Sequence, residues 1–156
     1  MRHFVSAPLE LGVFEGVVAA FDRADVVFYD VEHECPSYEA RVFVDNSDAD
    51  ANTPREREHG YAGSFTVFGH STCVGEHGHC DPSDRYVDEF DKRAPHPQIA
   101  WTKVVTVTEA LKRFDQATVT VTVVPVIAGP DGPESPDIMT FKSLRLAMYR
   151  DDDIID

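Results

Sequence analysis

Short runs of alternating hydrophobic and polar residues dominate this chain. The clearest run covers residues 117–124, Ala-Thr-Val-Thr-Val-Thr-Val-Val. Successive side chains of a strand point to opposite faces, so this pattern predicts a strand with Val119, Val121 and Val123 directed inward and the threonines outward. Pro125 has no backbone N–H, and we therefore expect it to mark the end of this strand or an exposed edge.

Five other segments combine hydrophobic residues with turn residues at their ends, as strands do. Between residues 38 and 45 the alternation is nearly complete, and Phe43 is the exception because it shares a face with Glu39 and Arg41. Residues 9–21 fit either a strand or a short helix, and their two glycines weaken the helical interpretation. The segments predicted as strands are residues 25–32, 38–45, 60–69, 101–107 and 139–149.

One short helix is predicted among these strands. Thr106 and Glu109 have the spacing of a capping box, in which two side chains bond the free backbone N–H groups at the start of a helix. A helix of at most about two turns is therefore expected within residues 106–114. Strands and long helices do not alternate along the chain, so a parallel sheet with crossover helices is not expected.

These elements predict an all-β fold, an antiparallel β-sandwich of about six to eight strands with one short helix. Each sheet buries its hydrophobic face against the other, which gives the Greek-key architecture of cupredoxin-like or immunoglobulin-like domains. At 156 residues the chain is expected to form a single domain, residues 1–156. Within it we expect an N-terminal extension at 1–24, the sandwich core at 25–149 and an acidic tail at 150–156.

Charge narrows the classes of partner. The chain has 14 basic and 28 acidic residues and a formal charge of -14, which disfavours binding to nucleic acids or anionic membranes and suits docking on a basic protein surface. No apolar run approaches the roughly 20 residues needed to span a bilayer. The N-terminus lacks the basic start and long apolar block of a signal peptide. We therefore expect no membrane insertion and a cytoplasmic location, with export alongside a partner as the alternative.

One stretch concentrates the residues that bind soft metal ions. Residues 61–80 begin as a strand and end as a loop that holds three of the seven histidines and two of the three cysteines. Imidazole and thiolate groups suit zinc or copper, and four of them would complete a tetrahedral site. The spacing matches no common zinc module, nor that of a blue-copper site. The candidate metal ligands are His70, Cys73, His77, His79 and Cys80.

A disulfide is the alternative for the cysteines of this loop. Cys73 and Cys80 are seven positions apart with two glycines between them. A bridge can close the loop if their Cα atoms come within about 4.4–6.8 Å of each other. Pairing of Cys35 with either of them is the other arrangement, and in a reducing compartment all three remain thiols.

A second and weaker cluster follows the first predicted strand, where His33 and Cys35 are each preceded by a glutamate. Enzymatic motifs are scarce elsewhere. The sequence contains no Gly-x-Ser-x-Gly elbow, no phosphate-binding Gly-x-x-x-x-Gly-Lys and no dinucleotide fingerprint. An enzyme that uses His70 or Cys80 as base or nucleophile has no further sequence feature in its support.

Three motifs resemble the C-terminal β-sandwich domain that follows the copper domain in some tyrosinases and polyphenol oxidases. The first is the strand end Val-Phe-Val-Asp at 42–45. The second is Tyr-Ala-Gly-Ser-Phe at 61–65, which runs to Phe-Gly-His at 68–70. The third is Val-Thr-Glu-Ala-Leu at 107–111, which leads into the strand at 119–124.

This resemblance, over about residues 38–127, implies a fold and a partner rather than a catalytic site. Type-3 copper sites use histidines from a helix bundle, and no such bundle is predicted here. The domain that the chain resembles binds no copper in the plant enzymes, packs against the catalytic domain and covers the mouth of its active site. By resemblance, we expect a non-catalytic accessory protein that packs on, shields or helps mature a tyrosinase-like copper enzyme. The alternative is a small copper- or zinc-binding protein that uses the loop from His70 to Cys80.

Overall fold

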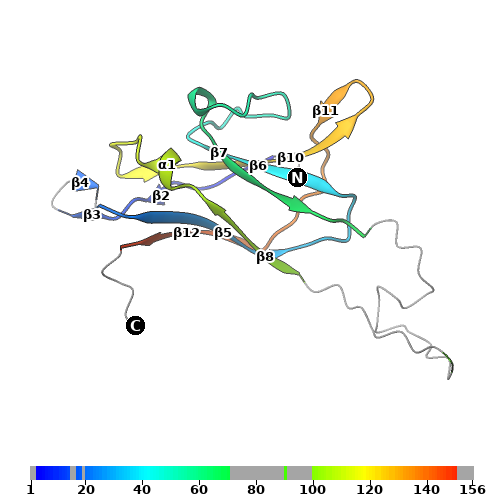
Figure 1. The fold of residues 1–156 in the computed structure, drawn as a ribbon, viewed down its shortest axis with the longest axis horizontal. Helices are drawn as coiled ribbons and strands as arrows, with labels where there is room; N and C mark the ends of the chain where they lie inside the picture. Colours follow the sequence, from blue (N-terminus) through cyan, green and yellow to red (C-terminus); the bar gives the residue numbers. More distant parts are fainter. Residues whose placement is uncertain (1–2, 15–16, 19, 71–89, 91–99, 151–156) are drawn as a thin grey trace.

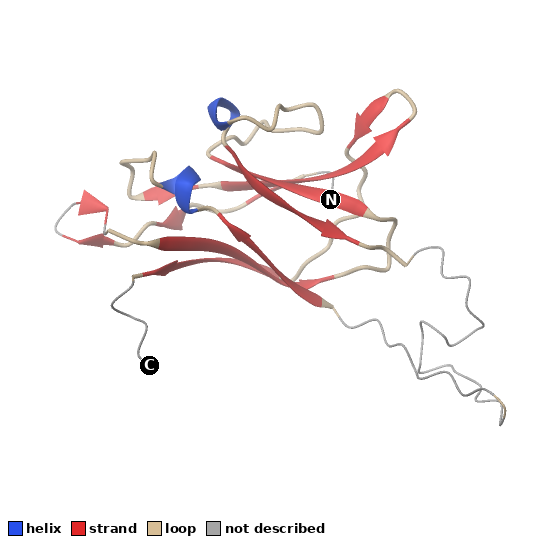
Figure 2. Ribbon diagram, viewed as in Figure 1, coloured by secondary structure: helices blue, strands red, loops and turns tan. Residues whose placement is uncertain are grey.

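The fold is all-β. In this computed structural model, all strand pairs among the described residues are antiparallel, as the sequence predicted (Figure 2). The helical elements in this part are a four-residue helix, α1 (Thr108–Leu111), and a 3-10 turn (Arg57–His59). Within the described ranges, no helix is long and apolar enough to cross a membrane. The structure describes residues 3–14, 17–18, 20–70, 90 and 100–150.

Two sheets form the layers of a sandwich (Figure 1). The first sheet has, in spatial order, β1 (Phe4–Val5), β10 (Val121–Gly129), β6 (Tyr38–Val44) and β7 (Tyr61–Val67), with β11 (Gly132–Glu134) paired to β10. The second sheet has β12 (Ser143–Tyr149), β5 (Arg23–Val31) and β8 (Trp101–Thr106). Two small pairs join β2 (Leu9–Glu10) to β9 (Thr118–Val119) and β3 (Val13–Phe14) to β4 (Val17–Val18). Each of the six predicted strand segments overlaps a strand of six or more residues, and the segment 117–124 is divided between β9 and the start of β10.

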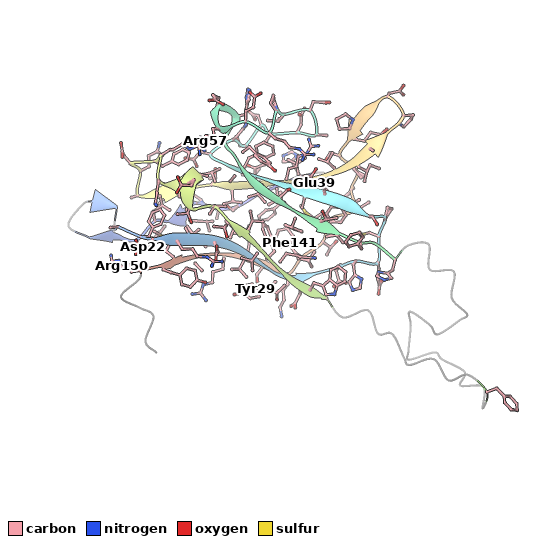
Figure 3. The ribbon with its side chains drawn as sticks, in the orientation of Figure 1. Asp22, Tyr29, Glu39, Arg57, Phe141 and Arg150 are labelled. Carbon is pink, nitrogen blue, oxygen red and sulfur yellow. The ribbon has the colours of Figure 1, made fainter. Side chains whose placement is uncertain are left out.

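The main hydrophobic core lies between the two sheets. The ring of Phe141 lies there (Figure 3), with its centroid 5.0 Å from that of Phe4 and 5.4 Å from that of Phe28. The three valines that the alternation predicted to face inward, in β9 and β10, are each at most 2% exposed. Removal of this apolar surface from water is the main favourable term in the stability of the fold.

The N-terminal segment contains two strands that pair with strands of the sandwich. β1 pairs with β10, and β2 pairs with β9. The backbone N–H of Ser6 donates to the carbonyl oxygen of Val121, and its hydroxyl oxygen accepts from the N–H of Val121, both at 2.9 Å. Leu11 is fully buried in the core. The packed core therefore begins well before residue 25.

Pro125 lies inside β10, so of the two predicted positions, the end of the strand or an exposed edge, the first is wrong. The N–H and C=O of Val121 both bond Ser6 on the β1 side, and alternate residues of β10 share that direction. β1 pairs no further along β10 than Val123, and β11 begins its pairing at Ile127. Position 125 thus faces the interval between these two strands, where a missing N–H costs no ladder hydrogen bond.

A second hydrophobic cluster covers the outer face of β6 and β10. The polar loop that follows β6 folds back over this face and buries Phe43, the residue that broke the alternation. Arg41 donates from Nη1 to the carbonyl oxygen of Ala51 at 2.8 Å, and Arg55 Nη2 bonds Glu39 Oε2 at 2.6 Å, so the loop is tied to the sheet. The members of this cluster are Phe43, Ala49, Ala51, Val124 and Val126, with Tyr61 packed against them.

The predicted short helix is present, but its predicted capping box is wrong. The N-cap residue of α1 is Val107, and no side chain caps it. Thr106 is instead the last residue of β8, paired with Asp25. The hydroxyl oxygen of the buried Thr108 accepts a hydrogen bond from the backbone N–H of Ala24 at 2.9 Å. Thr108 therefore ties the helix to the start of β5.

Candidate functional site

The structure describes one of the five predicted metal ligands. His70 follows β7 and is half-buried. Cys73, His77, His79 and Cys80 lie outside the described residues, so their roles as ligands, and the disulfide between the two cysteines, stay predictions. Within the described residues, no group of three or more His, Cys, Asp or Glu side chains is arranged to hold a metal ion.

His70 lies against His33, which the sequence analysis had placed in a separate cluster. The two Nδ1 atoms are 3.0 Å apart, and the ring centroids are 4.9 Å apart with the ring planes inclined by 72°. His33 is 3% exposed. The structure thus brings together residues from the two candidate clusters, which are 37 positions apart in the chain.

The backbone explains why these histidines meet. His33 lies in the connection from β5 in the second sheet to β6 in the first. The N–H of His70 donates to the carbonyl oxygen of His33 at 2.8 Å, and the N–H of Gly69 donates to Ser37 Oγ at 3.0 Å. A Cβ atom on residue 69 would lie 1.6 Å from the carbonyl oxygen of Cys35. Only glycine permits this approach, so Gly69 sets the position of His70.

An irregularity in β5 precedes the His33 side chain. The pairing with β8 shifts between Phe28, which is opposite Lys103, and Val31, which is opposite Trp101. β5 therefore carries one extra residue, and Asp30 in this bulge has a positive φ of 52°. Bulges of this kind redirect the side chains that follow them.

The imidazole ring of His33 packs against the indole ring of Trp101. The two rings are stacked with centroids 4.2 Å apart and planes inclined by only 12°. The ammonium nitrogen of Lys103 lies 4.4 Å from the centre of the Trp101 ring, a cation–π distance. Stacking of this kind fixes the orientation of the buried imidazole.

Cys35 and Tyr38 lie beside the histidine pair along the chain. Cys35 is a free thiol, so it pairs with neither of the other cysteines, and burial raises its pKa. Burial also raises the pKa of Tyr38, with a smaller contribution from the neighbouring Cys35. A thiol of raised pKa is mostly protonated at neutral pH and is a weak nucleophile. The geometry therefore gives no support to Cys35 as a catalytic nucleophile.

The two sheets differ in what covers their outer faces. The loop after β6 covers the first sheet, as described above. On the second sheet, Val27 of β5 pairs with Val104 of β8, and both point away from the core partners Val26 and Val105. Val104 is 49% exposed and Tyr149 of β12 is 45% exposed. Arg23, Asp25 and Arg145 share this side of the sheet by the same alternation, and the whole is defined here as the open face of the second sheet.

Comparison with protein-family models and with curated proteins gave no match. Comparison with solved structures did. Latent aurone synthase (polyphenol oxidase) from natural source matches at a TM-score of 0.54 and 15% sequence identity, over 95% of this chain and 24% of that chain. The recombinantly expressed latent enzyme matches at a TM-score of 0.54 and 14% identity, over 96% of this chain and 25% of that chain. The same recombinant enzyme co-crystallised with hexatungstotellurate(VI) matches at a TM-score of 0.54 and 14% identity, over 95% of this chain and 24% of that chain.

The chain has the fold of one part of a polyphenol oxidase. This confirms the resemblance read from the sequence at the level of the fold. At these identities the likeness concerns the fold alone, and the chain spans about a quarter of the length of the structures that it matches.

The sequence analysis missed the pairing of His33 with His70. The available signal was weak, because it consisted of two histidines near the ends of predicted strands. Their proximity depends on the crossing of the chain between two sheets and on the contact of Gly69 with Cys35. Neither feature has a local pattern in the sequence.

Proposed function

We propose that this chain is a non-catalytic accessory β-sandwich that packs on a tyrosinase-like type-3 copper enzyme and shields it or helps it mature. One observation carries the proposal. Nearly the whole chain, 95%, shares its fold with a segment that makes up 24% of a polyphenol oxidase. A chain with the fold of one part of a larger enzyme is suited to supply that part from outside.

The open face of the second sheet is the docking surface in this proposal. Its counterpart on the first sheet is already occupied by the loop after β6. Val104 and Tyr149 are exposed apolar positions on this face, and large aromatic side chains are enriched where proteins bind each other. The loop from His70 to Cys80 and the residues that follow it lie almost entirely outside the described residues.

Co-purification tests this function. A type-3 copper oxidase from the same source is expressed with an affinity tag, together with the untagged chain, and the purified enzyme is examined for bound chain, copper content and phenol oxidation. The proposal expects the chain to co-purify and to change either the copper content or the activity. A tagged enzyme that carries no chain, and whose copper content and activity are unaffected, contradicts it.

A pair of matched variants tests the docking face. Val104→Arg places a charge on the open face of the second sheet, and Thr66→Arg places the same charge at an exposed position of β7 in the first sheet. Burying an unpaired charge in an interface is costly, so Val104→Arg should abolish co-purification while Thr66→Arg retains it. Equal binding by both variants would place the interface elsewhere.

A further inference from the structure

The histidine pair next to Trp101 is held in place by the fold. The backbone hydrogen bond of 2.8 Å from His70 to His33 fixes the spacing of the two residues. The stack on Trp101 fixes the plane of the His33 ring. The two Nδ1 atoms thus meet at 3.0 Å in a site that the surrounding structure has already organised.

We infer that His33 and His70 bind a divalent transition-metal ion, with copper(II) preferred, through both Nδ1 atoms. Metal–imidazole bonds are about 2.0–2.1 Å long, so two nitrogens 3.0 Å apart subtend an angle of about 94° at the metal. Neighbouring ligands in tetragonal copper(II) sites are about 90° apart, whereas those in tetrahedral zinc sites are about 109° apart. Copper(II) is preferred because imidazole suits it and because it binds a given nitrogen site more tightly than zinc does.

In the metal-free chain, the same separation is a hydrogen bond between two imidazoles. One neutral ring donates its Nδ1–H to the Nδ1 lone pair of the other. Metal binding needs both Nδ1 lone pairs, so the donor ring loses its Nδ1 proton and takes one up at Nε2. Both rings stay neutral, and the ion takes the place of the proton that lay between the two nitrogens.

The charges near the pair are mixed. Glu32 and Glu34 flank His33 in the chain, and both are exposed. Lys103 brings the opposing positive charge, and its ammonium group lies over the Trp101 ring. The formal charge of the whole chain is -14, which raises the local concentration of cations around it.

The described residues supply two ligands to this site. Among the residues that the structure describes, no third His, Cys, Asp or Glu completes a ligand set with this pair. This inference does not depend on the proposed accessory function.

Copper titration of the untagged full chain tests the inference. Calorimetry measures affinity, and electron paramagnetic resonance counts the imidazole nitrogens bound to Cu²⁺. We expect the first equivalent of copper to show two nitrogen ligands. His33→Phe keeps an aromatic ring on Trp101, and both this variant and His70→Asn should weaken that binding at least about ten-fold, the smallest loss typical even for a second-shell partner of a metal ligand.

His59→Asn is the matched control. His59 is an exposed histidine in the 3-10 turn, so its replacement should leave copper binding unchanged. Circular dichroism verifies folding, and if His33→Phe does not fold, the half-buried position His70 decides the test. Uptake of less than about a tenth of an equivalent by the natural chain contradicts the inference, because a native site binds near one equivalent. Unchanged binding by His70→Asn contradicts it equally, since copper is then held elsewhere.

Discussion

A methyl group on residue 69 would lie 1.6 Å from the carbonyl oxygen of Cys35, so Gly69 and Cys35 are in direct backbone contact. Gly69→Ala must displace one of the two segments. We expect the free energy of unfolding to fall by about 1–3 kcal/mol, the usual cost of overpacking a well-packed site. Urea denaturation at neutral pH measures it.

Gly12→Ala is the control for this substitution. Nothing lies within 4 Å of a Cβ atom added at Gly12. The free energy of unfolding should therefore change by less than about 0.5 kcal/mol, as for most surface substitutions. Equal effects of the two variants would mean that the close contact of Gly69 with Cys35 does not restrict residue 69.

The hydroxyl group of Thr108 stabilises the junction between α1 and β5. Thr108→Val keeps the shape of the side chain but leaves the buried N–H of Ala24 without its acceptor. We expect a loss of about 1–3 kcal/mol in the free energy of unfolding. Thr106→Val, at the position that the sequence predicted as the cap, should cost less than about 0.5 kcal/mol. Thermal and urea denaturation of the two variants, side by side, would reveal the opposite order if Thr106 were the cap.

Tyr38 carries a buried hydroxyl group with no hydrogen-bond partner among the described residues. Tyr38→Phe removes a polar atom that was buried without compensation, so we expect the free energy of unfolding to stay the same or to rise by up to about 1 kcal/mol. Thr122→Val, at the other buried and unpaired hydroxyl, should behave in the same way. A loss above about 1 kcal/mol in either variant would show that the hydroxyl has a partner.

Stability should fall in alkaline solution. Burial raises the pKa of the Cys35 thiol above its ordinary value of 9.0 and that of the Tyr38 phenol above 10.0. As the pH rises, the unfolded chain therefore releases these protons before the folded chain does, and this favours unfolding. The stability that these two raised pKa values contribute is fully present below about pH 9 and is lost progressively as the pH rises above it.

Denaturation at a series of pH values between about 8 and 11 measures this effect. The double variant Cys35→Ala, Tyr38→Phe lacks both groups, so its free energy of unfolding should fall less steeply with pH than that of the natural chain. If the free energy of unfolding fell equally steeply with pH in the two proteins, folding would not shift the pKa of either Cys35 or Tyr38.

The strands could be predicted from sequence because their determinants are local. The alternating valines of β9 and β10 face the core as expected, since strand periodicity depends only on backbone geometry. The positions of Phe43 and Pro125 could not be predicted in this way, because they depend on the segments that cover or flank the strand. The loop after β6 accounts for Phe43, and the interval between β1 and β11 accounts for Pro125.

The candidate site was harder to predict because it depends on contacts between segments that are distant in the sequence. A capping box is recognised by spacing alone, but Thr108 rather than Thr106 makes the important hydrogen bond because Ala24 lies next to the helix only in the folded chain. His33 and His70 likewise belong to different sheet connections. Their meeting depends on tertiary structure that no spacing rule encodes.

The central claim is that this sandwich binds a type-3 copper enzyme. Native mass spectrometry of an equimolar mixture of the chain and a type-3 copper oxidase from the same source tests it most directly, because one spectrum reports both the stoichiometry of the complex and the number of copper ions in it. We predict a mass equal to the sum of one copy of each protein. A spectrum that contains only the two separate proteins would contradict the claim.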